Sequence, residues 1–288
     1  MPEQAASTTP PVIGCDFSSS PSLRKPIVIA TGVLAGGVCK LSKLEHIPTL
    51  DEFSDWLVRD ASWVGGFDLP FGLPRELVEH LGWPTAYEAC IAHYAQLSRD
   101  EIRDTFQRFC DARPAGGKFA HRATDGPAGS SPSMKWVNPP VAFMLHAGMP
   151  RILASEVHVP GLRECPEGQR QRVALEAYPG LLARAIIGQR SYKSDEAAKQ
   201  TTERFIARKD IVHALEMGQA TLGPQPLNLR LKLSHAQRDA LIADAKGDAL
   251  DAVLCMLQAA WALGQHLGGH ARYGLPQFDA LEGWIVGA

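Results

Sequence analysis

The chain has 288 residues, of which 45 % are hydrophobic and 21 % are charged, and its formal net charge is −2. This is the composition of an ordinary globular protein with enough apolar material for a large core. A net charge this close to zero excludes a strong overall attraction to nucleic acid or to anionic membranes. Any site for a polyanion therefore has to be a local basic patch.

No targeting or membrane segment is visible. Residues 1–11 (MPEQAASTTPP) lack the basic and apolar regions of a signal peptide, and the most apolar run, AVLCMLQAAWALG, is too short to span a bilayer. The six cysteines are scattered without a CxxC pair or zinc-ligand spacing. We expect a cytoplasmic protein with no membrane partner, in which residues 1–10 form a disordered tail and residues 11–288 form a single domain.

The first quarter of the chain predicts the order β-β-β-α-β. Residues 12–18 (VIGCDFS) and two runs within 24–47, broken by AGG, have the composition of strands. A helix is predicted from Thr49, which serves as N-cap with Glu52 at the capping-box position. A buried strand then ends at Asp68, because the Pro- and Gly-rich turn LPFGLP cannot continue it.

The remainder is predicted to be mainly helical. Residues 72–150 read as helices and loops, including the long polar loop 114–136, and so form a large insertion. Strands are expected at 154–159 (ASEVHV) and from Arg172, the second leading into a helix with Pro179 in its first turn. A basic helical segment at 193–217 and a long apolar helix from Asp248 follow.

Carboxylates stand at the ends of several of these elements. Asp16, Asp68 and Glu176 end predicted strands, and Asp248 with Asp251 opens the last helix. Parallel strands place their carboxyl ends at one edge of a sheet, so Asp16 and Asp68 are expected to lie a few ångströms apart if their strands are neighbours. Clustered carboxylates oppose folding unless a cation neutralises them, and an all-oxygen ligand set favours Mg²⁺ or Mn²⁺.

Structural roles compete with this hypothesis. Asp248 could be the helix N-cap, and Asp251 could interact with the positive end of the helix dipole. Glu176 could pair with Arg184 or Arg172.

Structural roles are also favoured for other polar residues. His158 could shuttle protons, but a hydrogen-bonded structural histidine is the favoured interpretation. Glu282 is expected to support the fold, with Trp284 anchoring the C-terminal segment in the core.

Basic residues gather in two places. In the glycine-rich loop, Lys118 and Arg122 could bind phosphate, with Arg113 nearby and Phe119 available for base stacking. The usual alternative is a solvated basic surface. The second group comprises Arg184, Arg190, Lys193, Lys199, Arg204, Arg208 and Lys209.

Together the segments GFDLPFGLP, LEAYPG, GDALDAVLCMLQA and ALEGWIVGA resemble domain-of-unknown-function family 429, a family of predicted ribonuclease H-like nucleases. The start of the last helix, DALDA, is also similar to the RuvC group of Holliday-junction resolvases. The resemblance implies an α/β fold with a mixed five-stranded sheet flanked by helices. It also implies metal ligation by Asp16, Asp68, Asp248 and Asp251. The chain departs from the resolvase group by having Asp68 in place of a glutamate, and by the long insertion between Phe71 and Val173.

These features favour a Mg²⁺- or Mn²⁺-dependent nuclease that hydrolyses nucleic acid by a two-metal-ion mechanism, with Asp16, Asp68, Asp248, Asp251 and Glu176 as catalytic residues. One alternative is a non-catalytic binding or assembly protein of the same fold. The other is an actin-like phosphotransferase, which would need glycine-rich phosphate loops that CDFSSSPS lacks.

Overall fold

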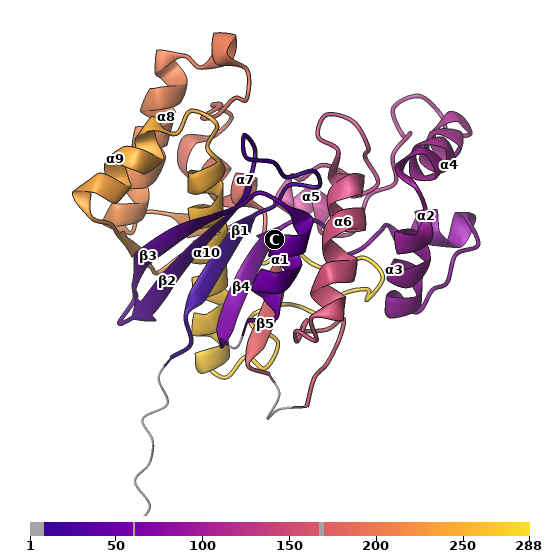
Figure 1. Cartoon of the computed structure of the whole chain (residues 1–288), viewed down its shortest axis with the longest axis horizontal. Coiled ribbons are helices and arrows are strands. Elements are labelled where there is room, and N and C mark those ends of the chain that lie inside the picture. The colour runs from indigo at the N-terminus through magenta and orange to yellow at the C-terminus, as the bar shows by residue number, and fades with distance from the viewer. Residues whose placement is uncertain (1–8, 60, 167–169) are drawn as a thin grey trace, which may run out of the picture.

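A six-stranded mixed sheet forms the centre of the computed structural model, which describes residues 9–59, 61–166 and 170–288 (Figure 1). The helices and strands, in chain order, are β1 (Val12–Asp16), β2 (Ile27–Ala35), β3 (Val38–Ile47), α1 (Leu50–Leu57), β4 (Trp63–Asp68), α2 (Arg75–His80), α3 (Tyr87–Gln96), α4 (Arg99–Asp111), α5 (Asp125–Ala128), α6 (Val141–Ala154), β5 (Arg172–Glu176), α7 (Pro179–Ile187), the 3₁₀ turn η2 (Ala197–Lys199), α8 (Thr202–Met217), β6 (Thr221–Leu222), β7 (Gln225–Pro226), β8 (Arg230–Lys232), α9 (His235–Ala243) and α10 (Asp248–Leu267).

The strand order is β5-β4-β1-β2-β3-β8. The strands β1, β2 and β3 form an antiparallel meander, whereas β4 pairs in parallel with both β1 and β5. Five of these strands lie in predicted segments. The sixth, β8, pairs in parallel with the start of β3 and corrects the predicted number of strands.

Two local predictions meet different outcomes. Thr49 is the N-cap of α1 and its hydroxyl accepts a hydrogen bond from the backbone N–H of Glu52, as predicted. The strand predicted at 154–159 is wrong, because α6 continues through Ala154. In that segment His158 forms only an isolated bridge to Val173.

Alternation along the strands divides the core into two layers. On one face, residues such as Val12 and Val28 pack with α7, α8 and α10; on the other, residues such as Ile13 and Ile29 pack with α1 and the insertion helices. Figure 1 shows α10 behind the sheet and α1 in front of it.

Helix α10 crosses the sheet with almost its whole surface buried, which explains its continuous apolar sequence. Two glycines permit this close approach. A Cβ atom on Gly14 would lie 2.0 Å from the carbonyl oxygen of Ala252, and one on Gly66 would lie 2.5 Å from that of Cys255. The backbone of β1 and β4 therefore contacts the helix directly.

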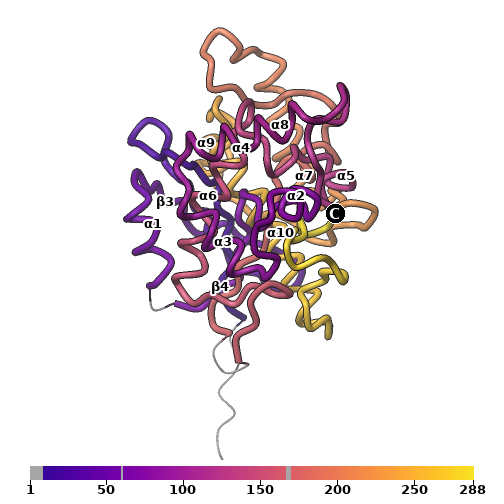
Figure 2. The backbone as a smooth tube through the Cα atoms, turned by 90° about the vertical axis from the view of Figure 1, so that its right-hand side faces the viewer, coloured from indigo at the N-terminus to yellow at the C-terminus, as the bar shows by residue number. Residues whose placement is uncertain are grey.

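The insertion between β4 and β5 contains α2 to α6. Figures 1 and 2 show α2, α3 and α4 grouped beside α6, on the side of the molecule away from α8 and α9. Their buried side chains, such as Tyr94 and Phe106, join the core layer in front of the sheet.

The C-terminal segment returns to the sheet, where Ile285 forms a parallel bridge to Glu176. Leu281, Ile285 and Val286 are buried there, whereas Trp284 is only half-buried, so the predicted anchor is the wrong residue. Residues 1–8 of the predicted tail lie outside the described residues. Within the described ranges, no helix combines the length and apolar character needed to cross a membrane.

Candidate metal centre

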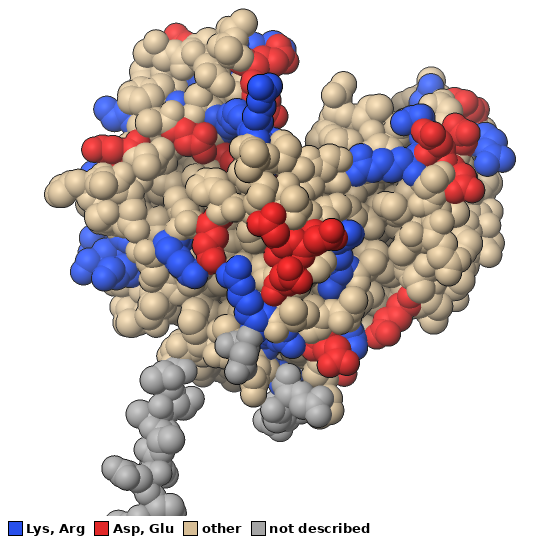
Figure 3. All heavy atoms as spheres, in the orientation of Figure 1, with Lys and Arg blue, Asp and Glu red and all other residues tan. Residues whose placement is uncertain are grey.

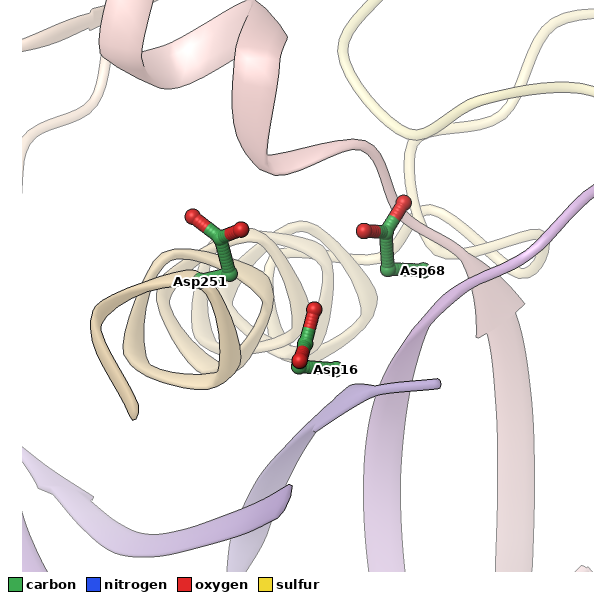
Figure 4. Close-up of side chains that lie close together, drawn as sticks. All are labelled: Asp16, Asp68 and Asp251. Carbon is green, nitrogen blue, oxygen red and sulfur yellow. The ribbon is translucent and has the colours of Figure 1, made fainter. Parts of the chain in front are cut away.

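Three aspartates meet where β1 and β4 end and α10 begins (Figure 4). Asp16 and Asp68 are direct partners in the parallel register of β1 and β4, as the sequence predicts. Asp251 comes from the first turn of α10. One carboxylate oxygen of each residue lies within 4.8 Å of the others, so the three side chains can hold a single cation.

The sequence explains this meeting point. The strand β4 ends at Asp68 because Pro70 follows in a turn, and Asp16 is the last residue of β1. The close packing of α10 against Gly14 brings the amino end of the helix to the same edge of the sheet. That end carries a partial positive charge, which favours a carboxylate in the first turn.

The electrostatics of the cluster call for a positive charge. Burial, followed by the charge of Asp251, raises the pKa of Asp16 well above its ordinary value, although Lys193 opposes the rise. Burial also raises the pKa of Asp251, and it raises that of Asp68 to about 7. Three neighbouring acids, two of them buried and one partly buried, favour a neutralising cation over full ionisation alone.

Part of that charge comes from the segment after α7. The ammonium group of Lys193 pairs with Asp251, and the Tyr192 hydroxyl donates a hydrogen bond of 2.5 Å to the same carboxylate. Burial opposes the charge on Lys193, but Asp251, Tyr192 and Asp16 raise its pKa well above the ordinary value. Sequence reasoning placed Lys193 in a basic surface and overlooked Tyr192, because nothing local marks a loop residue that contacts a distant helix.

Asp248 lies beside the cluster and outside it. Its carboxylate is 7 % exposed and pairs with Lys25 at 2.9 Å. It is not the helix N-cap either: that position is Gly247, and the carboxylate of Asp244 accepts the hydrogen bond from the N–H of Ala249 at 3.0 Å. Of the four predicted ligands, the structure thus brings three into mutual contact.

Glu176 belongs to a separate buried network. Its carboxylate receives both terminal nitrogens of Arg122, at 2.7 and 2.8 Å, and the backbone N–H of Phe71 at 3.0 Å. Arg122 also pairs with Asp125 and is 3 % exposed. Both predictions are corrected here, because the two charges are buried in this shared network: Glu176 does not join the aspartate cluster, and Arg122 does not face a phosphate in solvent.

The other predicted residues lie away from the cluster. Lys118 is exposed in the loop before α5. His158 is buried beside Val173 at the start of β5, the opposite end of that strand from Glu176, and its Nδ1 accepts a hydrogen bond from the N–H of Cys165. Glu282 accepts hydrogen bonds from the N–H groups of Arg75 and Ala123, a structural role.

A cleft of about 680 Å³ opens above Asp16 and Asp68. Its walls come from the β1–β2 loop, the start of α6 and the segment from α7 to Asp195. Figure 3 shows the surface notched between the part that carries α8 and the part that carries α4, with basic side chains on both sides of the notch. The cleft gives a ligand of substantial size access to the carboxylates.

The donor set fits a hard divalent cation, because all three groups are carboxylates and are the ligands that Mg²⁺ and Mn²⁺ prefer. Comparison of the chain with family models, with curated proteins and with solved structures finds no match. Functional inference therefore depends on this site.

Proposed function

We propose that this chain is a metal-dependent nuclease of the ribonuclease H-like type, which holds Mg²⁺ or Mn²⁺ at Asp16, Asp68 and Asp251. The observation that carries the proposal is the convergence of these three carboxylates, from two adjacent parallel strands and a helix start, beside an open cleft that Asp16 and Asp68 line. The meander followed by α1 and a parallel β4 next to β1 agrees with the resemblance drawn from the sequence.

The bound ions would activate water and stabilise the departing oxygen of a phosphodiester. The chain's own residues define where this happens. Asp16 and Asp68 hold the reacting centre at the strand ends, and Tyr192 fixes the carboxylate of Asp251 through its hydrogen bond. Lys193, whose side chain is 40 % exposed, is positioned to neutralise a phosphate beside Asp251.

A direct test combines metal-dependent melting with cleavage assays on labelled DNA and RNA. Wild type should gain thermal stability in millimolar Mn²⁺ as RT ln(1 + [L]/Kd) and should cleave at least one nucleic acid. Asp16→Asn should lose both effects, whereas Asp55→Asn, at an exposed position of α1, should keep both. Equal cleavage by wild type and Asp16→Asn would reject the proposal.

One observation favours a second candidate, a non-catalytic binding module. Lys193 pairs with Asp251 of the cluster and Lys25 pairs with the neighbouring Asp248, so protein cations already occupy part of the site. In a binding module, Asp16 and Asp68 would stay protonated and this pairing would take the place of a metal.

Lys193→Met separates the two functions. In a nuclease the substitution removes a competitor for Asp251, so the stabilisation by Mn²⁺ should persist or increase while the metal-free protein melts lower. In a binding module, neither wild type nor the variant should respond to Mn²⁺. The matched control is Lys43→Met, because Lys43 also pairs with a carboxylate, that of Glu45, but outside the aspartate cluster.

A further inference from the structure

The cleft above the aspartates has two chemically different walls. The start of α6 contributes an apolar wall, formed by Pro139, Pro140, Val141 and Met144. The facing side contributes a basic wall, formed by Lys25, Arg184, Arg190 and Lys193. We propose that the cleft binds a single-stranded polynucleotide, with its phosphates along the basic wall and its unpaired bases against the apolar wall.

Charge supports a polyanion as the occupant. Four aspartates and the four basic residues line the cleft, so their formal charges cancel. Because this inference rests on the proposed function, divalent cations at the aspartates then leave the lined surface with excess positive charge. A phosphodiester chain is attracted to such a surface.

The apolar wall determines which polynucleotide fits. Pro139 and Pro140 are exposed, and Val141 and Met144 are partly exposed, so their surfaces are available to a ligand. In a duplex the bases are paired and stacked inside and cannot contact such a wall while a phosphate reaches Asp16. In a single strand the bases are free to pack against it, and this packing is tolerant of sequence.

The experiment measures binding rather than cleavage. Fluorescence anisotropy in millimolar Ca²⁺, a divalent cation that also prefers oxygen ligands, compares labelled single-stranded 12-mers of DNA and RNA with the matching duplexes. Single strands should bind roughly tenfold or more tightly than duplexes, since only they contact the apolar wall. The double variant Val141→Ser/Met144→Ser should weaken single-strand binding by about three- to tenfold and leave duplex binding unchanged.

Two matched controls isolate the walls. Val58→Ser/Met217→Ser alters exposed Val and Met side chains elsewhere and should leave binding unchanged. For the basic wall, Arg190→Ala should lower the slope of log Kd against log salt by roughly one. Arg103→Ala should not, although each arginine is 51 % exposed and pairs with an aspartate at 2.7 Å.

Duplexes that bind as tightly as single strands, or apolar-wall variants that bind like wild type, would overturn the inference. Melting of each variant in chelator verifies that it is folded. The proposed nuclease fails by a different measurement, the absence of any Mn²⁺ effect on melting or cleavage. The two results are therefore distinguishable.

Discussion

Neutralising Asp68 should stabilise the metal-free protein. Burial, first of all, raises the pKa of this carboxyl from 3.8 to about 7, with Lys193 opposing the rise and Asp251 adding to it; none of the causes is a hydrogen bond. Asp68→Asn therefore removes the charge without removing a donor's partner. A carboxyl with a raised pKa resists ionisation in the folded state, so its charge costs stability.

The sign and size follow from linkage. Well below pH 3.8 the carboxyl is protonated in both folded and unfolded states and costs nothing. The cost grows as the pH rises from about 4 to about 7 and is constant above that, at about 4 kcal/mol for this change in pKa. If the substitution recovers only half of this free energy, about 2 kcal/mol, the Tm of Asp68→Asn should still exceed that of wild type by roughly 4–8 °C at pH 8. At pH 4 the two proteins should melt together.

Circular-dichroism melts at pH 4 and pH 8 test this, in chelator and in millimolar Mn²⁺, with Asp55→Asn as the exposed control. In Mn²⁺ the order should reverse or converge, because only wild type keeps all three ligands. An Asp68→Asn protein that melts below wild type at pH 8 in chelator, and still gains full stability from Mn²⁺, would refute the crowded-acid interpretation.

Three further outcomes follow from the contacts. Arg122→Met should lower the free energy of unfolding by about 3–5 kcal/mol, because it leaves the buried carboxylates of Asp125 and Glu176 without their cation. Chemical denaturation measures this change, and a loss below about 1 kcal/mol would contradict a buried ion-pair network. Tyr192→Phe should weaken Mn²⁺ binding by roughly tenfold, since Asp251 loses its orienting hydrogen bond; titration of Tm against Mn²⁺ shows it, and unchanged affinity would remove Tyr192 from the site. Gly14→Ala in β1 should destabilise by about 3 kcal/mol or more, because the added Cβ would meet the backbone of α10. Gly264→Ala in α10, where a Cβ meets open space, should be neutral or stabilise by about 0.5–1 kcal/mol, and equal Tm values for the two variants would contradict the close packing.

The sequence predicted those parts of the candidate site whose positions depend on neighbouring residues in the chain. Asp16 and Asp68 could be paired because strand-ending turns are visible in sequence and parallel neighbours align their carboxyl ends. Pro179 could be placed in the first turn of α7 because proline is favoured there, where the backbone N–H has no partner within the helix. The β8 strand escaped prediction because three residues are too few to show alternation.

The missed features are pairings between distant residues. Whether Glu176 faces a metal or Arg122 depends on how the loop before α5 folds back over β5, and no periodicity records that. The contacts of Lys193 and Tyr192 with Asp251 likewise join a polar loop to a helix. Asp248 and Asp251 look equivalent in sequence, but Asp248 lines the cleft and pairs with Lys25, whereas Asp251 is fully buried in the cluster.

The packing of α10 onto β1 also orders events during synthesis. Asp16 and Asp68 leave the ribosome early, but the third carboxylate follows only after the insertion and α8 have been made. Until α10 docks, the face of the sheet around Gly14 lacks the helix that covers it, and Asp16 and Asp68 lack the third carboxylate of the cluster. An unfinished or prematurely terminated product would therefore lack the three-carboxylate cluster, and would instead expose a surface that chaperones recognise.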